Sequence, residues 1–316
     1  MTEPKIAVLR QKIHGLSAVD YAAALRDRLP DVEVTIARTP AEEQELIGSA
    51  PIVTGFSMST AEVEAATNMD LFACVYAGVG HLDLDAFEAN GTAVTNASGV
   101  HGPNISEYVI GSILSFVRGF KRAWRQEDRN EWRSYPAREL QGSTVTVVGL
   151  GAIGQAVVDR LDPFGVDTIG VRYTPEKGGP TDDVLGFDEL HDALARTDYL
   201  VLACPLTDET EGLIDSEALL TLPTDAFMVN IARGGVVETD DLVSAMQANR
   251  IAGVALDVTD PEPLPNDHPL WDLDSVSITP HNAGHTPDYY ERLADIVATN
   301  VDRYRQGETD FENRVV

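Results

Sequence analysis

Basic residues, cysteines and long apolar runs are scarce in this sequence of 316 residues, and each scarcity narrows what the chain can do. The 23 lysines and arginines face 51 aspartates and glutamates, which gives a formal charge of −28. Such a surface repels phosphate backbones and anionic lipids, so we expect no nucleic-acid partner and no membrane association. The two cysteines, Cys74 and Cys204, lie in apolar runs, which favours buried free thiols over a disulfide.

The apolar run Ile6–Leu9 near the start of the sequence is too short for a signal core or a membrane span, so we expect a cytoplasmic protein. The acidic residues are spread along the chain, which is typical of a halophile-like surface that stays solvated in high salt. An ordinary acidic cytosolic protein is the alternative interpretation. Hydrophobic residues make up 43% of the chain, enough to bury cores in two domains.

Short apolar runs alternate with helix-length amphipathic segments along the whole chain, which is the pattern of βαβ units around parallel sheets. We expect one long helix over Asn104–Trp124 and a final helix over Pro287–Gln306. The fold class is therefore α/β with doubly wound sheets. The predicted strands are 5–9, 32–36, 52–54, 71–75 and 93–95 in the first part, and 143–148, 168–171, 199–203, 226–230, 251–256 and 276–279 in the second.

The segment 147–154, VVGLGAIG, has the spacing G-x-G-x-x-G between a predicted strand and a predicted helix over 152–161. Gly149 allows the tight turn, Gly151 lets the backbone approach a pyrophosphate, and Gly154 packs the helix against the strand. The helix start adds N–H donors and the positive end of the helix dipole. The motif therefore predicts a dinucleotide site, with a purely structural turn as the alternative.

Arg172, Tyr173 and Thr174 follow the next predicted strand, where an acidic residue would hold the ribose 2′-hydroxyl of NAD. No aspartate or glutamate stands there. The Arg172 guanidinium suits a 2′-phosphate instead, and the Thr174 hydroxyl can add a hydrogen bond. We therefore expect NADP(H) in preference to NAD(H). The alternative is that Arg172 is a surface residue and that NAD is bound without an acidic anchor.

Several segments, taken in order, resemble the D-isomer-specific 2-hydroxyacid dehydrogenase family, which includes glyoxylate/hydroxypyruvate reductases and phosphoglycerate dehydrogenases. Asn282 and His285 stand where small residues are commoner in that family, and Arg172 replaces its usual acidic residue. The resemblance covers nearly the whole chain. Its segments are YAGVGHLDLDAF at 76–87, GLGAIG at 149–154, CPLTDETEGLI at 204–214, NIARGGVV at 230–237, ALDVTDPEPLP at 255–265 and PHNAGHT at 280–286.

The resemblance implies two doubly wound domains. A Rossmann-type nucleotide domain would span residues 99–285, and a flavodoxin-like, discontinuous substrate domain would comprise 1–98 and 286–316. It also implies a homodimer that pairs through the long helix, and D stereochemistry for the hydroxy acid.

Reduction of a 2-keto acid needs a cation for the carboxylate, a proton donor for the carbonyl oxygen and a hydride. The resemblance implies Arg233 for the first, His281 for the second, and Glu262 as the partner that orients His281. All three follow predicted strands, at the sheet edge where ligands bind in open α/β folds. Taken singly, the same residues could be a surface arginine, a solvated loop acid and a polar cap.

The resemblance also implies further contacts with the cofactor and the substrate. Phe56, Met58 and Tyr76 are apolar or aromatic, which favours an apolar 2-keto acid over a phosphorylated one, although core packing would explain them equally well. The expected cofactor contacts, beyond the glycines and Arg172–Thr174, are Ala152, Ile153, Cys204, Pro205, Thr210, Ile231, Ala232, Asp257 and Gly284. The expected substrate contacts are Met58, Tyr76, Ala77, Gly78 and Val79.

His281 and His285 form an HxxxH pair, a spacing that binds zinc when it lies on a helix. Pro280 and Pro287 bracket the pair and Gly284 interrupts it, so we expect no metal, and the role of His285 stays open. Two other functions remain as alternatives. One is an NAD(P)-sensing protein like the family's transcriptional corepressors, and the other is a formate dehydrogenase, which needs no proton donor to a carbonyl.

Overall fold

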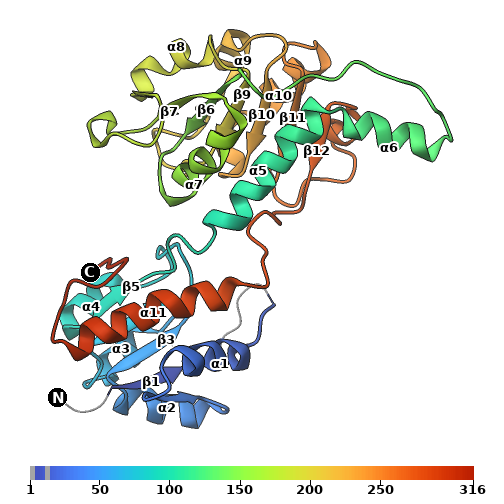
Figure 1. The fold of residues 1–316 in the computed structure, drawn as a ribbon. Helices are drawn as coiled ribbons and strands as arrows, with labels where there is room; N and C mark the ends of the chain where they lie inside the picture. The colour runs from blue at the N-terminus through green and yellow to red at the C-terminus, as the bar shows by residue number, and fades with distance from the viewer. Residues whose placement is uncertain (1–3, 11–14) are drawn as a thin grey trace. The chain divides into compact units, whose positions relative to one another are not determined.

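The computed structural model describes residues 4–10 and 15–316. The chain divides into two compact units: Met1–His101 with His285–Val316 (unit 1), and Gly102–Gly284 (unit 2). The divisions fall at 101/102 and 284/285, against 98/99 and 285/286 in the expected domains. Figure 1 shows an open sheet with helices on its faces in each unit.

Unit 1 contains a parallel five-stranded sheet in the order β2-β1-β3-β4-β5, the flavodoxin-like order. One core packs α1 and α11 on one face, and a second packs α2, α3 and α4 on the other. Helices on both faces explain why β3 and β4 are buried along their whole length. The elements are β1 Lys5–Val8, α1 Ala18–Arg28, β2 Glu33–Ile36, α2 Pro40–Ser49, β3 Ile52–Gly55, α3 Thr60–Ala65, β4 Leu71–Cys74, α4 Leu84–Asn90, β5 Ala93–Thr95 and α11 Tyr289–Arg305.

Unit 2 contains a parallel seven-stranded sheet in the order β12-β11-β10-β9-β6-β7-β8. Counted from β6, this is the Rossmann order 3-2-1-4-5-6 with one further strand, so the predicted fold class is confirmed. Helices α5 and α7 cover one face, and α8, α9 and α10 cover the other. The elements are α5 Gly102–Val117, α6 Phe120–Asp128, β6 Thr144–Val148, α7 Ala152–Leu161, β7 Asp167–Val171, β8 Asp183–Leu185, α8 Leu190–Leu194, β9 Tyr199–Leu202, α9 Ser216–Thr221, β10 Phe227–Asn230, α10 Thr239–Gln247, β11 Gly253–Leu256 and β12 Val276–Ile278.

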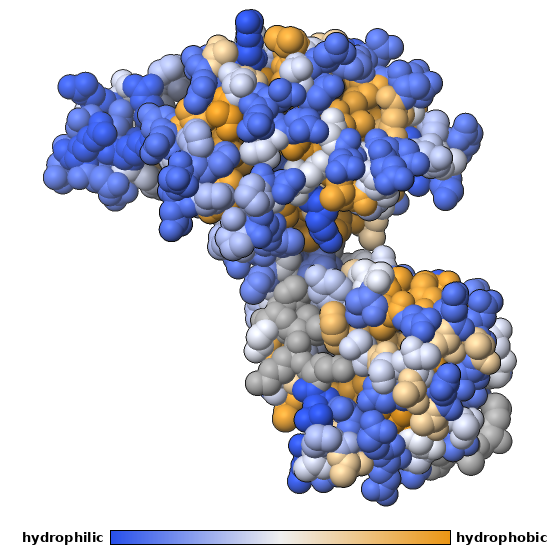
Figure 2. Space-filling view, turned by 180° about the vertical axis from the view of Figure 1, so that it is seen from behind, coloured by the Kyte–Doolittle hydropathy of each residue, from blue (hydrophilic) through white to orange (hydrophobic). Residues whose placement is uncertain are grey.

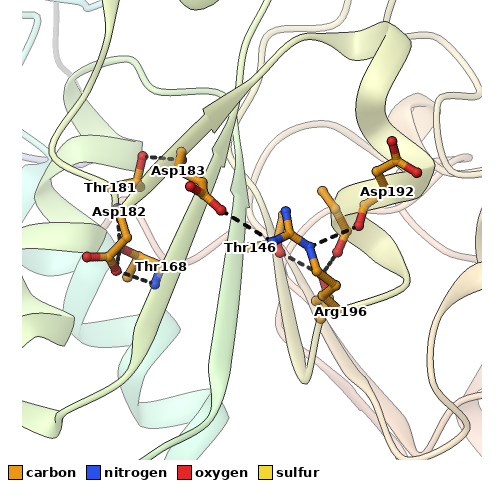
Figure 3. A network of polar contacts seen from close by, with 9 residues as sticks. Thr146, Thr168, Thr181, Asp182, Asp183, Asp192 and Arg196 are labelled. Carbon is orange, nitrogen blue, oxygen red and sulfur yellow. Dashed lines mark hydrogen bonds and ion pairs between the residues drawn. The ribbon is translucent and has the colours of Figure 1, made fainter.

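The predicted strands are present, with ends shifted by one or two residues, but the edge strand β8 was not predicted. Side-chain contacts hold it in place (Figure 3). The Asp182 carboxylate accepts hydrogen bonds from the backbone N–H and the hydroxyl of Thr168 on β7, and Arg196 pairs with Asp183 at 3.3 Å. Val184 and Leu185 pack against the two different cores of unit 2, and a strand of three residues is too short to reveal a hydrophobic period in the sequence.

The prediction of one long helix over Asn104–Trp124 was wrong. The helix breaks at Gly119, and α6 then projects from the sheet of unit 2 (Figure 1). Gly119 has φ +66°, and a Cβ there would lie 2.8 Å from the ring of Tyr135. Only glycine accepts both the left-handed backbone and the close ring, so this one residue ends the helix.

Hydrophilic residues dominate the face of the molecule seen in Figure 2, as the charge of −28 leads one to expect. Cys74 and Cys204 are buried free thiols, as predicted. None of the helices in the described part of the chain combines the length and the apolar composition needed to cross a membrane.

Candidate active site

The Gly-rich turn joins β6 to α7 and depends on two close backbone contacts. Gly149 has φ +98°, and a Cβ there would lie 2.5 Å from the backbone N of Cys204. A Cβ on Gly154 would lie 2.0 Å from the carbonyl oxygen of Gly149. No side chain larger than hydrogen fits at either position, so the turn is tight against the end of β9.

Gly151 has a different environment. It is the N-cap of α7, no described side chain caps this helix start, and no described atom lies within 4 Å of the position of a Cβ. The N–H groups of Ala152 and Ile153 open the helix beside this space. Uncapped N–H donors, the positive end of the helix dipole and an open approach are what a pyrophosphate requires, so the residues present fit a dinucleotide.

Arg172, Tyr173 and Thr174 begin the loop after β7. Arg172 donates from Nη1 to the carbonyl oxygen of Gly178 at 2.5 Å, which draws its guanidinium over the loop 173–178. Tyr173 is 73% exposed. The described contact uses one of the five donors of the guanidinium, so the group retains capacity for an anion.

The loop after β9 contains three of the expected cofactor residues. Cys204 is buried, and desolvation raises the pKa of its thiol to about 11, so it remains a neutral thiol. The buried Thr210 hydroxyl donates to the Pro205 carbonyl at 2.6 Å and accepts from the Thr207 N–H at 2.8 Å. Thr210 therefore shapes this loop from within.

Arg233 lies just beyond β10 with an exposed side chain, after the buried residues Ile231 and Ala232. Its Nη1 donates to the carbonyl oxygen of Ala232 at 2.6 Å. A Cβ on the next residue, Gly234, would lie 2.1 Å from the carbonyl group of Thr259. The Arg233 turn thus packs directly against the loop that contains Glu262.

Glu262 and His281 are brought together by the fold. The imidazole Nδ1 of His281 lies 2.7 Å from Oε1 of Glu262. The two side chains are 47% and 43% exposed, so a substrate can reach the other ring nitrogen, Nε2. His281 adopts φ +51°, in the left-handed region that non-glycine residues rarely occupy and that marks many functional positions.

Asp257 directly follows β11 and is almost fully buried, with 3% exposure. Its Oδ1 accepts hydrogen bonds from the Thr279 hydroxyl at 2.5 Å and the Asn282 N–H at 2.8 Å, and its Oδ2 accepts from the Ala283 N–H at 2.9 Å. A carboxylate offers about four acceptor positions, so Oδ2 keeps room for one further donor. Asp257 therefore organises the loop that contains His281 and Gly284.

The expected substrate residues belong to unit 1 and follow β3 and β4. Phe56 packs edge-on against Tyr76 with ring centroids 5.8 Å apart, while Met58 is buried. His81, which was not predicted, stacks on Phe56 at 4.1 Å and hydrogen-bonds the Phe56 carbonyl at 2.7 Å through Nε2. The loop itself is held by Asn96, which donates to the carbonyl oxygen of Ala77 at 2.7 Å, and by a turn between Val79 and Leu82.

The HxxxH spacing of His281 and His285 raises the question of a metal site. Among the described residues, no group of three or more His, Cys, Asp and Glu side chains is placed to hold a metal ion. The imidazole of His281 is instead engaged with Glu262.

Comparison with known proteins identifies the family. Residues 110–283, which lie in unit 2, match the sequence model described as "D-isomer specific 2-hydroxyacid dehydrogenase, NAD binding domain". The glyoxylate reductase of Thermofilum pendens is 36% identical over 78% of this chain and 75% of its own length. The chain belongs to the D-isomer specific 2-hydroxyacid dehydrogenase family.

Two further members of the family show its range. The D-3-phosphoglycerate dehydrogenase of Methanocaldococcus jannaschii is 31% identical over 91% of this chain, but the chain spans only 56% of that relative's length. The crystal structure of a D-isomer specific 2-hydroxyacid dehydrogenase from Xanthobacter autotrophicus Py2, in complex with NADPH and MES, has a TM-score of 0.80 and 27% identity. That comparison covers 100% of this chain and 98% of the other.

The family consists of oxidoreductases that act on the CH–OH group of 2-hydroxy acids, and the matched model describes its NAD-binding domain. The Gly-rich turn and the Glu262–His281 pair lie within the matched residues. Four residues near the predicted site residues were not predicted from the sequence: His81 in unit 1, and Asn104, Tyr108 and Thr279 in unit 2. The last three contact the His281 loop, and their only sequence signal is the i, i+4 spacing of Asn104 and Tyr108 on one helix face.

Proposed function

We propose that this protein reduces a 2-keto acid to the D-2-hydroxy acid, with NADPH as the hydride donor. When bound, NADPH supplies the hydride that the keto carbon accepts. His281 gives a proton from Nε2 to the carbonyl oxygen, and Glu262 holds the ring at Nδ1. Arg233 binds the substrate carboxylate and polarises the carbonyl. The 2.7 Å contact between Glu262 and His281 carries this proposal, because it pairs a proton donor with its orienting carboxylate.

The cofactor would be held along the carboxyl edge of the seven-stranded sheet. The helix start at Gly151, Ala152 and Ile153 suits the pyrophosphate, and Oδ2 of Asp257 can accept a carboxamide N–H of the nicotinamide. The remaining cofactor contacts would be made by Cys204, Pro205, Thr210, Ile231, Ala232 and Gly284.

NADP would be preferred over NAD. Arg172, with Tyr173 and Thr174 beside it, offers a guanidinium to the 2′-phosphate at the position where an acidic residue would serve NAD.

The substrate would be an apolar or aromatic 2-keto acid. In unit 1, Gly78 and the backbone of Tyr76, Ala77 and Val79 would approach the carboxylate. The rings of Phe56, Tyr76 and His81 form one cluster, and Met58 belongs to the core against which Tyr76 packs. These side chains would present apolar surface to the rest of the substrate. A phosphorylated substrate would bring two negative charges to aromatic faces that do not attract anions.

The decisive experiment is oxidation of NADPH, and in parallel NADH, with a panel of 2-keto acids. The panel comprises glyoxylate, hydroxypyruvate, pyruvate, 4-methyl-2-oxopentanoate, phenylpyruvate and 3-phosphohydroxypyruvate. We expect the apolar and aromatic acids to be reduced with the highest kcat/KM, and chiral chromatography to give the D product. Inactivity across the whole panel, with NADPH binding intact, would favour the nucleotide-sensing alternative.

We also propose that the protein is a homodimer. A groove of about 920 Å³ in unit 2 is lined by α5, α6, the segment after α6 and the edge of the sheet at β12 (the α6 groove). Apolar rings are exposed along α6 and after it: Phe120 is 44%, Trp124 56% and Trp132 103% exposed. The groove also gathers cations that are scarce elsewhere in the chain, and an acid-rich second copy complements them. These cations are Lys121, Arg122, Arg125, Arg129 and Arg133.

The cellular location proposed is the cytoplasm. Its support is the pair of buried free thiols, since reduced cysteines are the norm in that compartment.

A further inference from the structure

The loop that contains His281 is tied to helix α5 by a short chain of hydroxyl groups. Thr279 lies just beyond β12, and its hydroxyl donates to Oδ1 of Asp257 at 2.5 Å. The same Thr279 oxygen lies 2.8 Å from the hydroxyl of Tyr108. A threonine hydroxyl has one hydrogen, which Asp257 receives, so Tyr108 is the donor in the second contact.

The state of Tyr108 suits this direction. Burial raises the pKa of its hydroxyl, with the negative charge of Asp257 acting in the same sense, so the hydroxyl remains protonated and donates at neutral pH. The chain of donors therefore runs from Tyr108 to Thr279 to Asp257.

Asp257 connects these hydroxyl groups to the backbone of His281 and of the residues that follow it. Its carboxylate accepts the N–H groups of Asn282 and Ala283, which follow His281, and its carbonyl oxygen accepts the N–H of His281 itself at 2.8 Å. These contacts hold His281 in the left-handed conformation, with φ +51°. Without them a non-glycine residue would relax to a more favourable backbone conformation.

Helix α5 makes a second contact with the same loop. Asn104 donates from Nδ2 to the carbonyl oxygen of Ala283 at 2.8 Å. Asn104 and Tyr108 are four residues apart, so they project from one face of α5 and hold the loop at two points. Tyr108 and Thr279 also line the α6 groove.

We propose that Tyr108 and Thr279 are positioning residues for His281, and that they act through Asp257 to aim the imidazole at the substrate carbonyl. This inference rests on the proposed function, in which His281 is the proton donor. A displacement of about 1 Å in a catalytic group is enough to lower turnover by roughly a hundredfold, so the two hydroxyls matter without touching the substrate.

The test compares Thr279→Val, Thr279→Ser and Tyr108→Phe with the wild type. Thr279→Val removes both hydrogen bonds at nearly constant volume, and we expect kcat to fall roughly 10- to 100-fold while KM and the Kd for NADPH stay close to the wild-type values. Thr279→Ser keeps the hydroxyl and should restore most of kcat. Tyr108→Phe removes only the outer hydroxyl and should give a smaller loss of kcat.

Thr146→Val is the matched control. Thr146 lies on β6, and its hydroxyl is 2.6 Å from that of Thr197 and not in the His281 loop (Figure 3). The control removes one hydroxyl from a threonine pair that is more deeply buried than Tyr108 and Thr279, so it should lower thermal stability without lowering kcat. A loss of kcat in Thr146→Val as large as in Thr279→Val would overturn the positioning role.

A readout that does not depend on turnover separates this inference from the proposed function. The ¹H–¹⁵N correlations of the His281 ring report its orientation and its contact with Glu262 in the substrate-free protein. We expect them to shift in Thr279→Val, and to stay in place in Thr279→Ser and Thr146→Val. Unchanged His281 signals in Thr279→Val would refute the positioning role even if the wild type reduced no keto acid. His281 signals that shift in Thr279→Val, together with a wild type that reduces no keto acid, would leave the positioning role standing and refute the proposed function.

Discussion

At the scale of single residues, the candidate site depends on side chains held by very few contacts. The imidazole of His281 is held by Glu262, and both side chains are nearly half exposed. We predict that His281→Ala lowers kcat roughly 10²- to 10⁴-fold, because no other group would deliver a proton to the carbonyl oxygen. Steady-state NADPH oxidation with the best substrate of the panel measures this effect. His191→Ala, which removes an imidazole from an exposed position on helix α8, is the control and should retain activity. Full activity in His281→Ala would assign the proton transfer to another group.

Arg172 illustrates how one residue sets a cofactor preference. We predict that Arg172→Asp lowers kcat/KM for NADPH roughly 10- to 100-fold and improves the relative use of NADH, since the change removes a charge-assisted contact with the 2′-phosphate and supplies a carboxylate for the ribose hydroxyls. The ratio of kcat/KM values for the two cofactors measures it. Arg250→Asp changes the net charge equally at an exposed position after α10 and should leave the ratio unchanged. An unmoved ratio in Arg172→Asp would refute the role of Arg172.

At the scale of secondary-structure elements, one glycine determines how α5 passes into α6. We predict that Gly119→Ala lowers the free energy of unfolding by roughly 1–3 kcal/mol, because a Cβ is unfavourable at φ +66° and meets the ring of Tyr135. Urea unfolding followed by circular dichroism measures the change. Gly48→Ala is the control: it lies inside α2 with no described atom within 4 Å of its Cβ position, so its stability should be equal or slightly higher. Equal stability in Gly119→Ala would show that the break has another cause.

The same scale separates what the sequence could predict from what it could not. Strand after strand was predicted because parallel strands buried on both faces appear as short apolar runs. The break at Gly119 was not, because a single glycine within an apolar period is weak evidence until the position of Tyr135 is known. In the site, the Gly-rich turn and the Glu262–His281 pair were predicted from spacing and family resemblance. Thr279 and Tyr108 were not, because their hydroxyls meet only in the folded chain.

At the scale of the whole molecule, the charge of −28 and the α6 groove have opposite effects on the proposed dimerisation. Two copies that approach each other repel over the Debye length, which is about 10 Å at 0.1 M salt and about 3 Å at 1 M. The contacts that a second copy would make at the groove are short-ranged: the exposed rings of Trp124, in the groove lining, and of Trp132, which lies beside the lining residues Glu131 and Arg133, and cations against acids. Salt should therefore remove the long-range repulsion and leave most of the contact energy in place.

We accordingly predict that the dimer fraction and the midpoint of thermal unfolding both rise as KCl is increased from about 0.05 M to about 1 M. Sedimentation equilibrium and scanning calorimetry measure the two quantities in the same buffers. Trp124→Glu places a charge in the groove and should keep the chain monomeric at high salt, whereas Trp271→Glu, on the exposed turn before β12 and outside the groove lining, should not. A monomer at every salt concentration would refute the dimer. A dimer that dissociates as salt is added would show instead that ion pairs between copies outweigh both the repulsion and the apolar contact.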